Sequence, residues 1–309
     1  MKKIDTAFYP GFVRKAISFT IDDGNVPMDK KFLDIVKPHG ILGTFNLCSN
    51  NMKAFDADGY VEFYKGYEIA NHCKYHPFAM RDDTEYVFSD EEFDEATSDG
   101  TKLYKTDIDG MHHFKAANGW RRMATTEAYC RFADEGRVEL EKVFGKGSVK
   151  AYVWPYSMQN NSAVFEHLKN SGYQSIRKTG ETGDSTGFAL PADRTVWSYN
   201  ANHRSLLKWG KKYEEYEDDG ELKFFCFGVH AVDFERDKNW NELEEFAVTY
   251  GDRPSEFWYA TVSDIFDYED AVKALKIKDN CIVNDSDIKL YAKVDGVEVI
   301  LEPKSTYNI

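Results

Sequence analysis

Two adjacent carboxylates, Asp22 and Asp23, directly follow an alternating apolar run that ends at Ile21. Such alternation predicts a strand with one face in a core, and Gly24 predicts a turn directly after it. Neighbouring like charges raise each other's pKa, so the pair is unfavourable unless a cation or a strong hydrogen-bond donor lies nearby. The pair therefore indicates either a solvated turn before the helix expected from Pro27 or a site that binds a cation.

A second candidate lies further along the chain, where His72 and His76 are four residues apart. On a helical turn this spacing would place both imidazoles on one face, within reach of one metal ion. The HExxH motif of zinc peptidases is absent because Cys73 follows the first histidine. Taken alone, the two histidines would equally suit a surface or packing role.

The aspartates and the histidines follow two different predicted strands, and this allows them to meet. In an α/β barrel the C-terminal ends of the strands converge on one face. One aspartate and two histidines would leave an open coordination position for water, which is the arrangement of a catalytic metal site. The second aspartate could then serve as the base for that water.

Two later strand ends carry residues suited to the same reaction. The segment Tyr152–Ser157 ends a strand in aromatic residues and a proline, which offers a rigid wall and a backbone N–H for an oxyanion. His230 ends the predicted strand Leu222–Val229, where it could protonate a leaving group. Because four strand ends share these features, we expect a catalytic site rather than four unrelated packing positions.

Together the four segments resemble the NodB-type polysaccharide deacetylases, which form carbohydrate esterase family four. The resemblance extends from about residue 14 to 275, and four segments carry it: Ser18–Gly24, Asn71–Pro77, Trp154–Ser157 and Gly228–His230. It implies a deformed (β/α) barrel of seven or eight strands that removes acetyl groups, usually N-acetyl groups of amino sugars, with a divalent metal. We expect zinc, with cobalt or nickel as alternatives.

By position, the resemblance also implies a role for each residue. The metal would be held by three side chains, those of Asp23, His72 and His76. Asp22 would be the general base that takes a proton from the attacking water. Tyr156 would stabilise the oxyanion through its backbone N–H, and His230 would be the general acid.

The chain departs from the family pattern at its third motif. Val153 stands where relatives carry an arginine that contacts the catalytic aspartate. Asp22 should therefore ionise less readily, unless Arg177 or Arg194 reaches it from another strand.

Two further departures concern supporting residues. The aspartate and tryptophan of the family's fourth motif, where the aspartate tunes the acid histidine, have only Asp193 and Trp197 as candidates here. Cys73 replaces the serine or threonine that usually follows the first histidine, so a supporting hydrogen bond is expected to be lost.

Composition limits the class of partner. The formal net charge of −14 argues against nucleic acid or an anionic membrane, and an acetylated carbohydrate is the expected partner. The five cysteines are scattered without a CxxC pair and indicate reduced thiols. Since no apolar run approaches 18 residues and no leader is recognisable, we expect a cytoplasmic protein, although a chain exported with a removed leader would look the same. The oligomeric state is not predicted.

The pattern of elements predicts the domain organisation. Strands and helices alternate through residues 1–277, as in a (β/α) barrel, with an acidic, turn-rich insertion at about 81–121 to which we assign no strands. Residues 278–309 are expected to form a small β appendage with a hairpin turn at Asp295-Gly296. The clearest helices are expected at four places: Thr125–Phe144, Ser162–Asn170, Trp240–Tyr250 and Ser263–Ile277.

Two other functions remain consistent with the sequence. A non-catalytic carbohydrate-binding barrel would explain Val153 and the incomplete fourth motif. An amidase acting on a small non-sugar amide would suit the missing leader and an insertion that roofs the cleft.

Overall fold

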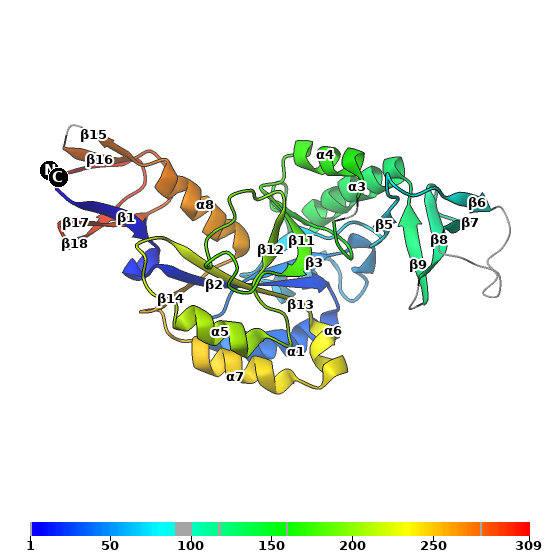
Figure 1. Ribbon diagram of the computed structural model, residues 1–309, viewed down its shortest axis with the longest axis horizontal. Helices are drawn as coiled ribbons and strands as arrows, with labels where there is room; N and C mark the ends of the chain where they lie inside the picture. The colour runs from blue at the N-terminus through cyan, green and yellow to red at the C-terminus, as the bar shows by residue number, and fades with distance from the viewer. Residues whose placement is uncertain (1, 90–100, 117–118, 159, 279) are drawn as a thin grey trace.

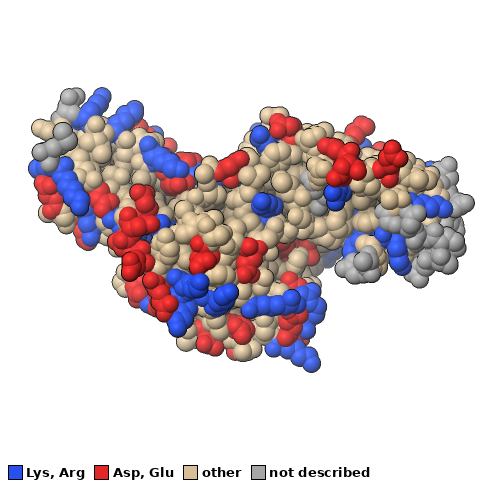
Figure 2. All heavy atoms as spheres, in the orientation of Figure 1, with Lys and Arg blue, Asp and Glu red and all other residues tan. Residues whose placement is uncertain are grey.

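The computed structural model describes residues 2–89, 101–116, 119–158, 160–278 and 280–309. The described residues form three parts along the long axis of the molecule (Figure 1). A group of short strands beside the chain termini lies at one end, a sheet surrounded by helices lies in the middle, and a second sheet lies at the other end. Figure 2 shows acidic and basic side chains interspersed on this face of the central part.

The central sheet consists of parallel strands. Their order is β12 (Trp197–Tyr199), β11 (Ser175–Glu181), β10 (Ala151–Val153), β4 (Glu68–Asn71), β3 (Thr44–Leu47), β2 (Lys15–Asp23) and β13 (Lys223–His230), and β14 (Phe257–Tyr259) also pairs with β2. A parallel bridge between Ala201 and Phe227 connects the β12 side to β13, so the sheet curves back towards itself. This arrangement confirms the predicted α/β fold.

Helices cover the outside of this sheet on both sides (Figure 1). They are α1 (Val26–Val36), α2 (Ala57–Phe63), α3 (Thr126–Phe144), α4 (Ser162–Asn170), α5 (Leu206–Glu214), α6 (Ala231–Asp237), α7 (Trp240–Tyr250) and α8 (Val262–Lys273). The predicted bounds of α4 and α7 are confirmed. The prediction for α8 was too long, because Lys276–Lys278 forms strand β15 against β16 (Cys281–Asn284). The sequence analysis did not identify α6.

Strand β2 is buried on both faces, whereas the alternation predicted one buried face. Phe19 packs against Phe32 of α1 with ring centroids 4.9 Å apart. Ser18 and Thr20 are also buried, and Thr20 accepts a hydrogen bond of 2.7 Å from the Asn46 amide. The polar residues of β2 are therefore internal because hydrogen bonds satisfy them.

The segment predicted as a loop-rich insertion contains strands. A mixed five-stranded sheet has the order β5 (Phe78–Ala79), β9 (Gly119–Ala124), β8 (Met111–Ala116), β7 (Lys102–Lys105) and β6 (Val87–Ser89). It extends beyond α3 and α4, away from the termini (Figure 1). These strands are short and only partly buried, so their alternation was too brief to recognise. Residues 90–100 and 117–118 of the predicted insertion lie outside the described residues.

The C-terminal strands form two three-stranded sheets. One joins β1 (Ile4–Phe8) to β17 (Leu290–Val294) and β18 (Val297–Leu301), and the other joins β15 and β16 to β19 (Ser305–Asn308). The hairpin predicted at Asp295-Gly296 connects β17 to β18. The participation of β1 was not predicted, because its partner is almost 300 residues away in sequence. None of the described helices combines the length and the apolar character needed to cross a bilayer.

Candidate active site

Asp23, His72 and His76, the three predicted metal ligands, lie together at the C-terminal ends of β2 and β4. Oδ1 of Asp23 is 3.5 Å from Nε2 of His72 and 3.3 Å from Nε2 of His76. All three atoms are buried, and none makes a hydrogen bond with the described residues. Buried polar atoms normally have partners, so three convergent unsatisfied ligand atoms fit a divalent cation.

The two histidines meet without lying on a helical turn. They belong to a loop that follows β4, in which Cys73 and His76 have positive φ angles of 62° and 54°. Left-handed backbone at non-glycine residues is uncommon and is maintained only where the surroundings enforce it. The loop therefore brings the imidazoles together by a local backbone conformation that the spacing alone does not reveal.

Helix α3 holds this loop in place. The Asn71 amide donates a 2.7 Å hydrogen bond to the Ala133 carbonyl, and the Lys74 N–H donates to the Phe132 carbonyl at 3.2 Å. A Cβ atom at Gly136 would lie 2.7 Å from Oδ1 of Asn71. Glycine at this position thus allows the helix to approach the histidine loop closely.

The surroundings prepare both histidines to bind a metal. Nδ1 of His72 donates to the Val153 carbonyl at 2.8 Å, which leaves the lone pair of Nε2 directed towards Asp23. Burial, together with the neighbouring His72, lowers the pKa of His76 to about 4. His76 is therefore neutral near pH 7, as a ligand must be.

Asp22, the predicted base, is buried beside a cation. Its carboxylate accepts a 2.7 Å hydrogen bond from the Asn46 amide and forms an ion pair with Arg177 of β11, which is only 1% exposed. Burial by itself would raise the pKa of Asp22, but the charge and hydrogen bond of Arg177, together with the neighbouring histidines His72 and His230, outweigh it and hold the pKa below its ordinary value. Arg177 thus supplies the cation beside Asp22 that Val153, which stands at the expected arginine position, does not supply.

Arg194, the other arginine considered for this role, lies elsewhere. Its guanidinium pairs with Glu269 and Asp270 of α8, with N to O distances of 2.7 Å in each pair. Of the two candidates, only Arg177 contacts Asp22.

His230, the predicted acid, ends β13 and faces the same centre. Its Nε2 is 3.9 Å from Oδ2 of Asp23, and its Nδ1 donates to Asp233 of α6 at 2.9 Å. Burial by itself would lower the pKa of His230, but Asp233 and the carboxylates of Asp22 and Asp23 outweigh it and raise the pKa to about 9. The sequence analysis missed Asp233, although a carboxylate three residues after a strand-terminal residue is a signal for a helix cap.

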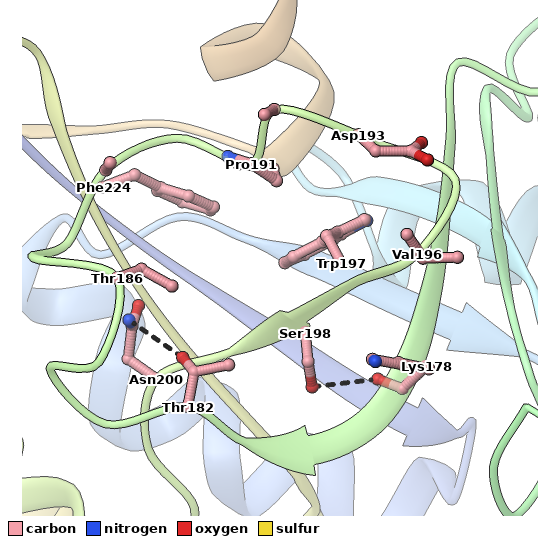
Figure 3. Close-up of a pocket in the computed structure, with 12 residues that line it drawn as sticks. Lys178, Thr182, Thr186, Pro191, Asp193, Val196, Trp197, Ser198, Asn200 and Phe224 are labelled. Atoms are coloured by element: carbon pink, nitrogen blue, oxygen red, sulfur yellow. Dashed lines mark hydrogen bonds between the residues drawn. The ribbon is translucent and has the colours of Figure 1, made fainter.

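The sequence candidates for the fourth motif do not contact His230. Asp193 accepts hydrogen bonds from the N–H and hydroxyl of Thr195, and Trp197 packs in a separate apolar cluster. Both line a cavity of about 290 Å³ beside β12 (Figure 3), together with Asn200 and Thr182. None of the predicted catalytic or metal-binding residues lines this cavity. Neither of the two candidates is therefore placed to support His230, and Asp233 is the carboxylate that contacts it.

Tyr156, the predicted oxyanion residue, lies next to His76. Its φ of 61° is in the left-handed region, and its carbonyl accepts a 2.6 Å hydrogen bond from the Thr179 hydroxyl. Its ring stacks on Phe78 at 3.7 Å and meets the His76 ring edge to face at 4.5 Å. The constrained backbone places Tyr156 directly beside His76, a predicted metal ligand.

Comparison with known proteins gives the following matches. The family model described as polysaccharide deacetylase matches residues 11–176. Similar solved structures include the Xyl-CE4 domain of a multidomain xylanase from the hindgut metagenome of Trinervitermes trinervoides, at 13% identity over 84% of this chain and 92% of that chain, with a TM-score of 0.47. No curated protein matches the chain significantly.

Two further structures are similar at the same level. A family 4 acetyl xylan esterase from Clostridium thermocellum, in complex with a cobalt ion, shares 12% identity over 82% of this chain and 90% of that chain, with a TM-score of 0.46. Peptidoglycan deacetylase PdaC from Bacillus subtilis shares 14% identity over 84% of this chain and 94% of that chain, with a TM-score of 0.45. Because the family model covers more than half of the sequence, the chain belongs to the polysaccharide deacetylase family, whose members are hydrolases of acetyl groups.

Proposed function

We propose that the protein is a metal-dependent deacetylase that hydrolyses N-acetyl or O-acetyl groups of a carbohydrate. The observation that carries the proposal is the set of three buried, unsatisfied ligand atoms on Asp23, His72 and His76. Beside this set lie the carboxylate of Asp22 and the imidazole of His230, which are register partners on the neighbouring strands β2 and β13. A metal centre with a base and an acid beside it is what hydrolysis of an acetyl group requires.

Asp23, His72 and His76 would hold the metal, with zinc as the first expectation and cobalt or nickel as alternatives. When bound, such an ion lowers the pKa of a coordinated water and polarises a carbonyl. Neutral imidazoles and a carboxylate are the donors that zinc prefers.

The other residues have distinct roles in the proposed reaction. Asp22 accepts the proton of the attacking water, while Arg177 and Asn46 hold its carboxylate in position. Tyr156 offers its backbone N–H to the oxyanion. His230 donates a proton from Nε2 to the leaving amine or alcohol, and Asp233 orients the ring through Nδ1.

The non-catalytic alternative rested on Val153 and on the unassigned fourth motif. Two contacts count against this alternative. Arg177 supplies the cation beside Asp22 that Val153 does not, and Asp233 supplies the carboxylate beside His230 that the fourth motif would provide. The amidase alternative shares the same residues and differs only in substrate.

Acetate release tests the proposal directly. Chitooligosaccharides and acetylated xylan would be incubated with protein stripped of metal by a chelator, before and after addition of zinc or cobalt, and metal content would be measured in parallel. We expect acetate only with metal. Asp22→Asn should abolish acetate release with metal content intact, whereas Asp23→Asn should lose the metal. Equal activity of Asp22→Asn would remove the central claim, and sugar binding without acetate would favour the non-catalytic barrel.

A further inference from the structure

A cavity of about 290 Å³ lies next to the metal ligands and is shared by the barrel and the insertion. From the barrel it is lined by Tyr75, His76 and Tyr156. His76 is a metal ligand and a wall of this cavity at once. A sugar with its acetyl group at the metal would therefore extend into the cavity.

The insertion contributes the opposite wall through His113 of β8 and Trp120, Arg121 and Arg122 of β9. Strand β5 pairs only with the Met123–Ala124 end of β9, so the part of β9 that lines the cavity lies along an edge not covered by β5. His113 and Arg122 are direct cross-strand partners. Two rigid strands thus position these side chains beside the metal site.

The two arginines differ from every other arginine of the chain. The chain has eleven arginines, and the nine others each form an ion pair with a carboxylate. Arg121 donates only to the Trp120 carbonyl, at 2.9 Å, and neither Arg121 nor Arg122 forms an ion pair with the described residues. In a chain with a net charge of −14, two guanidinium groups at one cavity without an acidic partner among the described residues call for an explanation.

The described residues that line the cavity include two positively charged side chains and none that is acidic. Both guanidinium groups line the same cavity as Tyr156, a side chain that itself contacts His76.

We propose that Arg121 and Arg122 bind an anionic group, a carboxylate or a phosphate, carried by the acetylated sugar. The proposal rests on the proposed function, since it places the acetyl group at the metal. A guanidinium forms paired hydrogen bonds with a carboxylate or phosphate, and these charge-assisted bonds are among the strongest available in a protein. The substrate class would be acidic amino sugars rather than neutral polymers.

Equilibrium binding tests this without turnover, because the metal-free protein keeps the arginines. Three probes would be titrated by calorimetry: N-acetylglucosamine as the neutral sugar, N-acetylmuramic acid as the carboxylate and N-acetylglucosamine 6-phosphate as the phosphate. We expect at least one anionic probe to bind about tenfold more tightly than the neutral sugar at low salt, as one charge-assisted hydrogen bond implies. The two anionic probes distinguish the carboxylate from the phosphate.

Variants that remove one positive charge test whether the two arginines cause the preference for an anionic probe. Arg121→Gln and Arg122→Gln should each bind the anionic probe several-fold less tightly and the neutral sugar as before. Lys105→Gln is the matched control, since Lys105 is an exposed cation of the same sheet on β7, two strands from β9. With zinc bound, the arginine variants should raise KM for the anionic sugar and leave kcat unchanged.

The outcomes separate this proposal from the proposed function. Equal or absent binding of the three probes by the unaltered protein, or variants that behave like Lys105→Gln, would overturn the anionic site. Acetate release from all sugars at equal efficiency would also contradict the anionic site, but it would support the proposed deacetylase function. An anionic preference that both arginine variants abolish, without acetate from any sugar, would support the binding site and contradict the deacetylase.

Discussion

At the scale of single residues, two buried partners support the predicted base and acid. Arg177 stabilises the charge of the Asp22 carboxylate, and Asp233 orients His230 and favours its protonated form. Both partners are largely buried, so their hydrogen bonds form in surroundings where an unpaired charge is costly. The charge states of Asp22 and His230, the predicted base and acid, thus depend on these two neighbours.

Replacement of Arg177 tests the first partner. Arg177→Met should lower kcat for acetate release on the order of 10²-fold, because the buried Asp22 loses the cation that favours its ionised form. Arg177→Lys keeps the positive charge and should retain more activity. Zinc content, measured by elemental analysis, should match the unaltered protein in both variants. Full activity of Arg177→Met would show that Asp22 needs no cation.

Replacement of Asp233 tests the second partner. Asp233→Asn should lower kcat about tenfold or more, since an amide no longer stabilises the protonated imidazole of His230. Asp193→Asn serves as the control, because Asp193 was the sequence candidate for the same role but contacts only its own turn. The kcat for acetate release would be measured for both variants under steady-state conditions. A loss in Asp193→Asn that equals the loss in Asp233→Asn would contradict the assignment.

At the scale of elements, helix α3 and the histidine loop act as one unit. The loop has little regular structure of its own, and hydrogen bonds to α3 compensate for this. The close contact depends on a residue without a side chain in the middle of the helix, at Gly136. Helix propensity alone would favour alanine there by about 1 kcal/mol, so packing has outweighed propensity.

Gly136→Ala should therefore destabilise the protein by about 1–3 kcal/mol and weaken zinc binding about tenfold. The added methyl group would meet Asn71 at the base of the histidine loop and displace it. Val138→Ala, at an exposed position of the same helix, controls for changes in the helix itself. Chemical denaturation and zinc titration measure the two effects. Unchanged zinc affinity in a destabilised Gly136→Ala protein would show that metal binding by the histidine loop does not depend on its contact with α3.

At the scale of the whole molecule, one buried acid should link global stability to pH. Asp29 of α1 is completely buried and accepts a 2.8 Å hydrogen bond from the Tyr64 hydroxyl, while its other oxygen has no partner among the described residues. Burial raises the pKa of Asp29 to about 7, well above the value of about 4 expected in the unfolded chain. The folded state therefore binds this proton more tightly than the unfolded state.

The sign of the effect follows from linkage. The contribution of Asp29 to stability is fully present below pH 4 and is lost as the pH rises through 7. Asp29→Asn should remove this loss and increase the free energy of unfolding at pH 8 by a few kcal/mol, with little gain at pH 4. Asp34→Asn, at an exposed position of the same helix, is the control. Urea unfolding between pH 4 and 8 measures the difference, and parallel curves for Asp29→Asn and the unaltered protein would refute it.

The sequence by itself determined the parallel α/β fold and the residues at four strand ends, because a strand and the polar residues that end it are encoded by neighbouring positions. The tertiary structure decided which groups support them. Arg177 is 155 residues from Asp22, and Arg121 and Arg122 share a cavity with His76, a predicted metal ligand, only because an inserted sheet places them there. Such contacts depend on strand order and on packing between distant segments, which no local pattern records. The buried polar face of β2 has the same origin, since only the curved sheet places Thr20 and Asp22 inside.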